Sequence, residues 1–118
     1  MNPIKVLLAD DHDVVRKGMK MLLEDEEGVL VIGEAADGAE AIEKVKALMP
    51  DVVILDLTMP KMTGIEAAAV ISQEYPSVRI LIFSMHNNRE YIINSVENGA
   101  SGYLLKDTGK DELLRALS

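Results

Sequence analysis

The sequence contains no cysteine and few aromatic residues. Without cysteine the chain can form no disulfide and carry no catalytic thiol, which is typical of a cytoplasmic protein. Aromatic residues make up 3% of the chain, so its core must be built from Val, Ile, Leu, Ala and Met. No apolar run approaches the roughly 18 residues of a membrane span, and the start MNPIKV does not resemble a signal peptide. We therefore expect a soluble, cytoplasmic protein without membrane contact.

Positive charge is also scarce. Lys and Arg number 12 against 20 Asp and Glu, which gives a net charge of −8. Binding to a phosphate backbone needs clustered Lys and Arg, so this segment itself is a poor candidate for binding nucleic acid. The length of 118 residues fits one domain. We expect a single domain over residues 1–118.

Short apolar runs alternate along the chain with amphipathic helical patterns. Three of the runs are almost continuously apolar and rich in Val and Ile, as expected of parallel strands covered on both faces. Strict alternation of strand and helix implies right-handed crossovers. The pattern predicts an α/β fold, a doubly wound five-stranded parallel sheet with helices on both faces. The predicted strands are residues 4–9, 29–32, 52–57, 78–83 and 102–105.

Helix start signals support this reading. Capping-box spacing occurs twice, at Asp37 with Glu40 and at Thr63 with Glu66. Thr108 is a candidate N-cap for the last helix, predicted over residues 110–117.

Polar side chains lie at the carboxyl ends of four of the predicted strands. Asp10 and Asp11 end the first, Asp56 the third, Ser84 the fourth and Lys106 the fifth. In open parallel sheets, functional groups gather at the carboxyl ends of the strands. Three acids, a hydroxyl and an amine are thus predicted to meet at one edge.

Three carboxylates at one edge need a positive charge nearby, because they repel one another. Magnesium suits them, since it prefers oxygen ligands, keeps several waters and often takes one or two carboxylates. We expect Asp11 and Asp56 to be direct ligands, Asp10 to act through water, and the Thr58 carbonyl to supply a backbone oxygen.

Taken singly, most of these residues have ordinary structural explanations. Asp10 and Asp11 could be a solvated strand end or a cap for the first helix, and Ser84 and Lys106 could simply terminate strands. Asp56 is harder to explain in that way, because it follows the apolar run VVIL. Burying a carboxylate there without a functional or structural partner would be unfavourable. The shared edge is what favours a functional site.

The segments LLADDH, DVVILDLTMPKMTG, FSMH and GASGYLLKD resemble the receiver domains of two-component response regulators, most closely those of the NarL/LuxR type. The resemblance covers nearly the whole chain. It implies the sheet order 2-1-3-4-5 of the flavodoxin/CheY-like fold. It also implies that Asp56 accepts a phosphoryl group from a sensor histidine kinase, so the chain is a signalling switch and not an enzyme, apart from self-catalysed phosphoryl transfer and slow autodephosphorylation.

The resemblance gives further residues a role. Asp10 and Asp11 match the magnesium-binding pair, Ser84 the hydroxyl that binds the phosphoryl group, and Lys106 the cation that pairs with it. Tyr103, three residues before the lysine, matches the switch aromatic. The family also implies a phosphorylation-dependent homodimer and a C-terminal helix-turn-helix domain after residue 118, through which the full-length protein would bind DNA and control transcription.

The sequence departs from many receivers at two places. Met85 and then His86 follow the site hydroxyl, where a small residue is common, and a bulky Met85 would crowd access to the acyl phosphate. Asp107 stands where many receivers have proline, which leaves the isomer of the preceding peptide bond open. We expect the side chains of His12 and His86 to be exposed bystanders.

Other functions fit the sequence less well. A flavodoxin-like cofactor binder needs a glycine-rich phosphate loop after the first strand, where this chain has DDHD. An aspartyl phosphatase needs a second acid two residues after the nucleophile, where this chain has Thr58. A phosphorylation-independent protein-binding module and a stand-alone phosphoryl shuttle stay open as alternatives.

Overall fold

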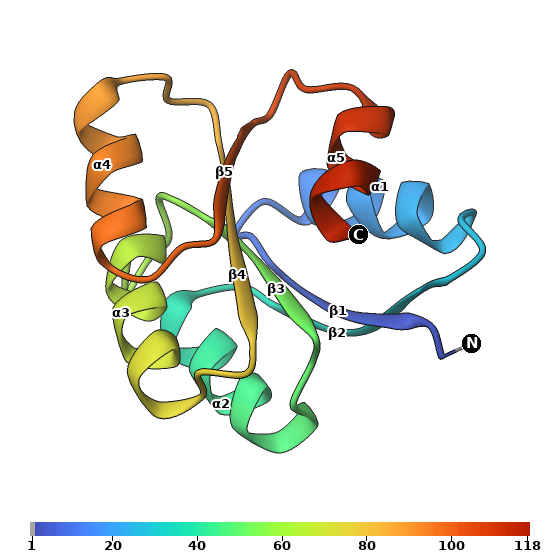
Figure 1. Ribbon diagram of the computed structural model, residues 1–118, viewed down its shortest axis with the longest axis horizontal. Coiled ribbons are helices and arrows are strands. Elements are labelled where there is room, and N and C mark those ends of the chain that lie inside the picture. Colours follow the sequence, from blue (N-terminus) through green and yellow to red (C-terminus); the bar gives the residue numbers. More distant parts are fainter. Residues whose placement is uncertain (1) are drawn as a thin grey trace.

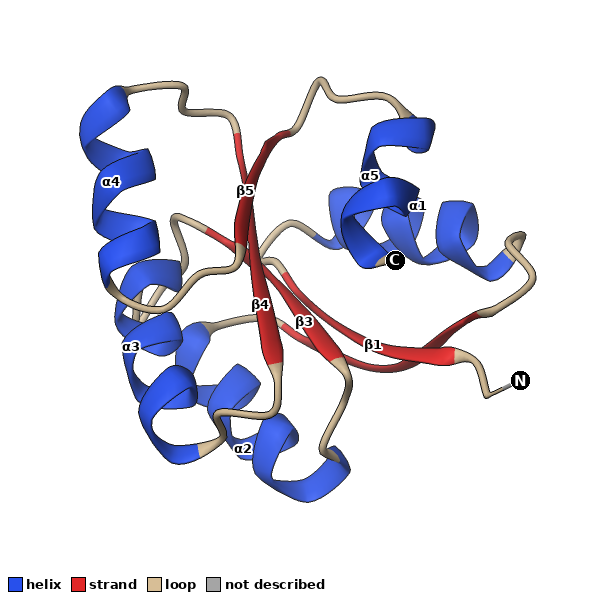
Figure 2. Ribbon diagram, viewed as in Figure 1, coloured by secondary structure: helices blue, strands red, loops and turns tan. Residues whose placement is uncertain are grey.

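The computed structural model describes residues 2–118. Strands and helices alternate strictly along the chain (Figure 2), as the sequence predicts. The five strands form one parallel sheet in the order β2-β1-β3-β4-β5, which confirms the predicted fold class. The elements are β1 (Ile4–Ala9), α1 (Asp13–Glu24), β2 (Val29–Ala35), α2 (Gly38–Leu48), β3 (Val52–Asp56), α3 (Gly64–Glu74), β4 (Arg79–Ser84), α4 (Arg89–Glu97), β5 (Gly102–Leu105) and α5 (Lys110–Leu117).

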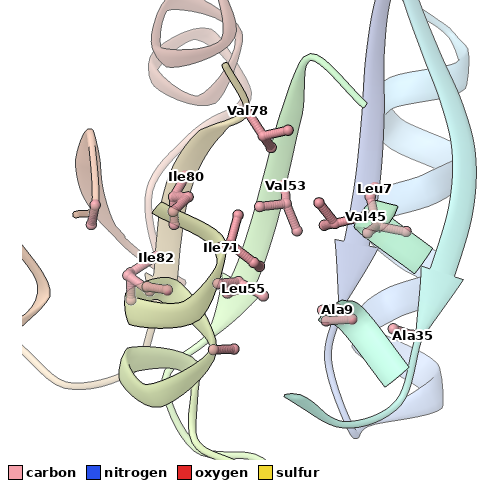
Figure 3. Close-up of a cluster of buried hydrophobic side chains, with 14 of the residues drawn as sticks. Leu7, Ala9, Ala35, Val45, Val53, Leu55, Ile71, Val78, Ile80 and Ile82 are labelled. Carbon is pink, nitrogen blue, oxygen red and sulfur yellow. The ribbon is translucent and has the colours of Figure 1, made fainter. Parts of the chain in front are cut away.

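Helices cover the sheet on both faces. Helices α1 and α5 lie on one side, and α2, α3 and α4 lie on the other (Figure 1). The central strand β3 is buried throughout, and its side chains alternate between the two layers. Val53 and Leu55 pack with Ile71 of α3 in one cluster (Figure 3), whereas Val52 and Ile54 belong to the cluster that includes residues of α1 and α5. No helix within residues 2–118 is long and apolar enough to cross a membrane.

Strand β2 is longer than predicted. The prediction stopped at residue 32 because Gly33 and Glu34 interrupt the apolar pattern. The backbone nevertheless continues to pair with β1 past a register shift, and Leu8 lies opposite Glu34 and Ala9 opposite Ala35. The extension brings Glu34 to the carboxyl edge of the sheet, where its carboxylate pairs with Arg16. The bounds of two other strands differ from the prediction by one residue: β3 ends at residue 56, and β4 runs over residues 79–84.

Two predicted helix caps form. The Thr63 side chain accepts a hydrogen bond from the Glu66 N–H, and the Glu66 carboxylate accepts one from the Thr63 N–H. Asp37 likewise accepts from the Glu40 N–H at 2.8 Å. The Glu40 carboxylate, however, accepts from the Ala36 N–H, one residue before the N-cap. The second capping box is therefore only half formed.

The predicted N-cap at Thr108 is wrong. The N-cap of α5 is Gly109, and no side chain caps that helix. Thr108 instead closes the turn after β5, where its N–H donates to the Leu105 carbonyl at 2.9 Å. No peptide bond among residues 2–118 is cis, so the bond between Lys106 and Asp107, which the sequence left open, is trans.

Candidate functional site

The loops after β1, β3, β4 and β5 surround a cavity of about 240 Å³ at the carboxyl edge of the sheet. Four of the five residues predicted to share this edge line it, and Asp10 lies buried beside them. The expected convergence is therefore observed. The lining residues are Asp11, His12, Asp56, Thr58, Ser84, Met85, His86 and Lys106.

Asp56 is the most buried acid that faces this cavity. It ends the central strand, and it is only 5% exposed. Burial raises the pKa of its carboxyl, and repulsion from Asp10 adds to that rise. Lys106 and a backbone hydrogen bond from Thr58 lower the pKa in part, yet it stays above its ordinary value. Gly64 allows α3 to begin against this strand end, because a Cβ there would lie 2.2 Å from the Asp56 carbonyl oxygen.

Lys106 supplies the buried positive charge. Its Nζ lies 3.0 Å from Asp10 Oδ2 and 3.3 Å from Asp56 Oδ1, and its side chain is 11% exposed. Burial alone would lower the pKa of this amine, but hydrogen bonds and charge attraction from the two acids outweigh burial and raise it. One ammonium thus bridges two buried carboxylates.

The donor set fits a magnesium ion. One carboxylate oxygen from each of Asp10, Asp11 and Asp56, together with a ring nitrogen of His12, lie within 4.8 Å of one another. Three carboxylates and the ammonium of Lys106 leave two negative charges, which a divalent cation would balance. Hard oxygen donors around a water-accessible cavity are what magnesium prefers. These residues could therefore hold the ion.

The two neighbouring acids have different surroundings. Asp10 is buried, and its carboxylate accepts from the His12 N–H at 2.8 Å and from Lys106. Asp11 is more exposed and lines the cavity. Neither acid is the N-cap of α1, which is His12 without a side-chain cap. The alternative explanation of the pair as a helix cap is thus excluded.

His12 contributes more than the sequence suggested. Its side chain is 64% exposed, as expected, but it is not a bystander. The ring Nδ1 lies 3.3 Å from Asp10 Oδ1 and 3.1 Å from Asp11 Oδ1. Only the presence of imidazole directly after two acids could have signalled this contact. Ring position depends on side-chain torsions, which the sequence does not give.

The far side of the cavity is a chain of hydrogen bonds through the backbone of His86. The buried Ser84 hydroxyl accepts from the His86 N–H at 3.0 Å, and the Tyr103 hydroxyl donates to the His86 carbonyl at 2.6 Å. The His86 ring is exposed, as expected, and lies 5.0 Å from the Tyr91 ring, centroid to centroid. Met85 is exposed at the rim.

Arg16 is a site component that the sequence analysis missed. Its side chain is 12% exposed and donates to Glu34 at 3.0 Å, to Asp13 at 2.6 Å and to the Asp10 carbonyl. It thereby ties the loop after β1 to the end of β2. The spacing from Asp13 to Arg16 was the only signal in the sequence, because Glu34 is 18 residues away and lay beyond the predicted strand.

Comparison with known proteins agrees with the geometry. The family described as "Response regulator receiver domain" matches residues 6–118. The oxygen regulatory protein NreC of Staphylococcus haemolyticus is 44% identical over 115 residues, which cover 97% of this chain and 53% of that protein. The nitrate/nitrite response regulator NarL of Escherichia coli is 41% identical over 115 residues, covering 98% and 53%. The chain spans about half the length of these curated relatives.

Solved structures agree as well. The signal receiver domain of a NarL response regulator from Mycobacterium tuberculosis has a TM-score of 0.95 at 37% identity, covering 99% of this chain and 94% of that one. A chain of the CheX-CheY-BeF₃-Mg complex from Borrelia burgdorferi has a TM-score of 0.90 at 30% identity, covering 97% of this chain and 86% of that one. The chain belongs to the receiver domains of two-component response regulators, with regulators of the NarL/LuxR type among its relatives.

Proposed function

We propose that this receiver domain accepts a phosphoryl group on Asp56 from a sensor histidine kinase, in a reaction that depends on magnesium. The observation that carries the proposal is the placement of Asp56. This buried carboxylate faces an open cavity, lies 3.3 Å from the ammonium of Lys106, and shares an acidic cluster with Asp10 and Asp11. The domain acts as a regulatory switch and not as a classical enzyme.

In the transfer step, an Asp56 carboxylate oxygen attacks the phosphorus atom of the kinase phosphohistidine. A P–O bond forms to Asp56, the P–N bond to the kinase histidine breaks, and that nitrogen takes the bonding electron pair. Phosphoryl transfer depends mainly on positioning and on neutralising the oxygens of the transferred group. Lys106 brings positive charge to that place, and a bound magnesium ion would neutralise further negative charge there.

The surroundings of the acids support a division of labour at the metal. Asp10 already accepts hydrogen bonds from Lys106 and from the His12 backbone, so we assign it a water-mediated contact. Asp11 and Asp56 face the cavity and are assigned as direct ligands. Thr58 lines the same cavity, and we assign its carbonyl as the backbone ligand. The structural similarity to a chain from a complex that contains BeF₃ and magnesium supports this use of the fold.

Phosphorylation would disturb the hydrogen bonds on the far side of the cavity. A phosphoryl group on Asp56 brings strong acceptor oxygens and negative charge. Lys106 can pair with one oxygen, and the Ser84 hydroxyl can donate a hydrogen bond to another. If Ser84 moves, the backbone at His86 loses a partner, and that backbone also holds the Tyr103 hydroxyl. Inward rotation of Tyr103 would then bias a two-state equilibrium of the surface around α4 and β5.

We assign the output to transcription in the cytoplasm. The relatives are regulators about twice as long as this chain, so we propose that a C-terminal helix-turn-helix domain reads the state of the receiver. Bulky Met85 and the neighbouring His86 line the entrance and would modulate the access of phosphodonors and of water.

The central test is covalent modification. With Mg²⁺ and acetyl phosphate, the wild-type protein should gain the mass of one phosphoryl group, and Asp56→Asn should gain none, because an amide is a far poorer nucleophile than a carboxylate. Asp51→Asn is the matched control, since Asp51 is an exposed acid that directly precedes β3, at the opposite end of the strand from Asp56. Equal labelling of Asp56→Asn and wild type would refute the assignment.

The switch is tested by self-association. Saturation with beryllofluoride and Mg²⁺ should produce a larger species in sedimentation for wild type and a smaller response for Lys106→Ala. If the variant, shown to be saturated, associates as wild type does, Lys106 has no part in the switch. If neither protein associates, dimerisation of this domain is not the output.

A further inference from the structure

The acidic cluster contains one donor that is not an oxygen. The chain has two histidines, His12 and His86. Of these two, only His12 belongs to the group of potential metal ligands that the described residues form with Asp10, Asp11 and Asp56. Its Nδ1 lies 3.1 Å from Asp11 Oδ1 and 3.3 Å from Asp10 Oδ1. The ring is exposed, so it can carry its hydrogen on Nε2 and leave the Nδ1 lone pair toward the acids.

The distance of 3.1 Å to Asp11 Oδ1 matches the edge of a coordination octahedron. Two ligands at about 2.1 Å from an ion and at right angles to each other are about 3 Å apart. The ring nitrogen therefore stands where an adjacent ligand would stand relative to the Asp11 oxygen. A hydrogen bond from a ring N–H to the acids would give similar distances, and titration with Zn²⁺ and Mg²⁺ distinguishes the two arrangements.

Hydrogen bonds hold the backbone of His12 beside the cluster. His12 is the N-cap of α1, and its N–H donates to the Asp10 carboxylate at 2.8 Å. Its carbonyl accepts from the Arg16 N–H at 3.0 Å. The Arg16 side chain in turn holds the Asp10 carbonyl. The backbone of His12 is thus held on both sides next to the cluster, so that binding of an ion has to order only the side-chain torsions of the imidazole.

We infer that His12 converts this pocket into a mixed nitrogen and oxygen site that binds borderline transition cations, Zn²⁺ in particular, more tightly than the carboxylates alone would. Imidazole suits zinc, nickel and copper, whereas magnesium is bound mainly through oxygen. His12 therefore sets the metal preference of the pocket and contributes little to magnesium affinity. The inference rests on the proposed function only in that it concerns the same metal pocket.

The test is a pair of titrations of the untagged protein, with Zn²⁺ alone and with Mg²⁺ alone, followed by calorimetry. His12→Asn should weaken Zn²⁺ binding at least about tenfold, as expected for loss of an imidazole ligand, and change Mg²⁺ affinity less than about twofold. Asp51→Asn is the control, because this exposed acid directly precedes β3 and lies at the opposite end of that strand from the cluster. It should change neither affinity. Nitrogen-15 NMR of the two imidazoles should show Zn²⁺ shifting Nδ1 of His12 and leaving His86 unchanged.

Other results of these titrations would contradict the role of His12 or that of magnesium. Unchanged Zn²⁺ affinity in His12→Asn, or an unshifted His12 ring, shows that His12 is not a ligand. An equal loss of Zn²⁺ and Mg²⁺ affinity shows that His12 only orders the loop, and thermal unfolding in chelator reveals whether the variant is misfolded. His12→Gln provides a second variant if it is. Absence of Mg²⁺ binding to the wild type refutes the magnesium part of the proposed function, whatever His12 does.

Discussion

The two halves of the carboxyl edge differ in how firmly they are held. On the acid side, β3 is buried throughout, and Asp10 and Asp56 are tied together by the ammonium of Lys106. On the other side, α4 buries one residue, Ser95, of its nine, all of which the structure describes. Its exposed apolar side chains are Tyr91, Ile92, Ile93 and Val96. The electrostatic machinery thus lies in the part that resists movement, and the neighbouring segment has little packing to oppose a change of shape.

Loss of the buried ammonium of Lys106 should lower the free energy of unfolding more than any other change considered for the two sides. In chelator, Lys106→Met leaves two buried carboxylates without their shared cation, and removing one partner of a buried pair costs about 3–5 kcal/mol. Lys110→Met is the control, because Lys110 pairs with Glu26 at the surface and should cost far less. Urea unfolding measures both. Equal losses would show that the acid side is no more tightly held than the surface.

Matched isoleucines test the packing difference directly. Ile82 in β4 is fully buried and Ile93 in α4 is 45% exposed. Ile82→Ala should lower the free energy of unfolding by about 2–5 kcal/mol, since it leaves a cavity. Ile93→Ala should change it by about 0.5 kcal/mol or less. A large loss for Ile93→Ala in chemical denaturation would mean that α4 is an integral part of the core.

Bound magnesium should raise the free energy of unfolding by stabilising the acid side. An ion that binds only the folded chain adds about 1.4 kcal/mol at ten times its dissociation constant. Without metal, Asp11→Asn should be neutral or stabilising because it relieves repulsion among carboxylates. Thermal unfolding with Mg²⁺ and with chelator checks both statements. A clear loss of stability for Asp11→Asn in chelator would make the acidic cluster structural.

The pH dependence of Asp56 should give the smallest effect, because the opposing influences of burial and of Lys106 partly cancel. The folded-state pKa of Asp56 is raised, so its contribution to stability is fully present below the unfolded pKa and is lost as pH rises through the folded pKa. Asn does not titrate. In chelator, the stability of Asp56→Asn relative to wild type should therefore increase as pH rises from below the ordinary pKa of an aspartate toward neutrality. A decrease over that range would contradict the raised pKa.

Much of the fold could be predicted because it follows from apolar runs that alternate with helical patterns. The same reasoning placed Asp10, Asp56 and Lys106 at one edge, since parallel strands end on the same side. The prediction failed at positions where tertiary contacts determine the local structure. The pairing of Glu34 with β1 is hidden by Gly33 next to it, and the turn after β5 prevents Thr108 from acting as a cap.

The side-chain contacts of the site were beyond prediction for a related reason. Arg16 reaches a partner 18 residues away, and His12 reaches the acids through its own side-chain torsions. Neither contact leaves a periodic signal in the sequence. The types and places of the site residues follow from strand ends, whereas the loop contacts that orient them require coordinates.

The most direct measurement locates the phosphoryl group itself. Treatment with acetyl phosphate and Mg²⁺ followed by borohydride reduces an aspartyl phosphate to homoserine, which peptide mass spectrometry can assign to a position. We predict homoserine at position 56 with Mg²⁺ and unmodified Asp56 in chelator. Homoserine at Asp10 or Asp11 instead, or equal conversion of Asp56 with and without the metal, would contradict a magnesium-dependent phosphoacceptor at the end of β3.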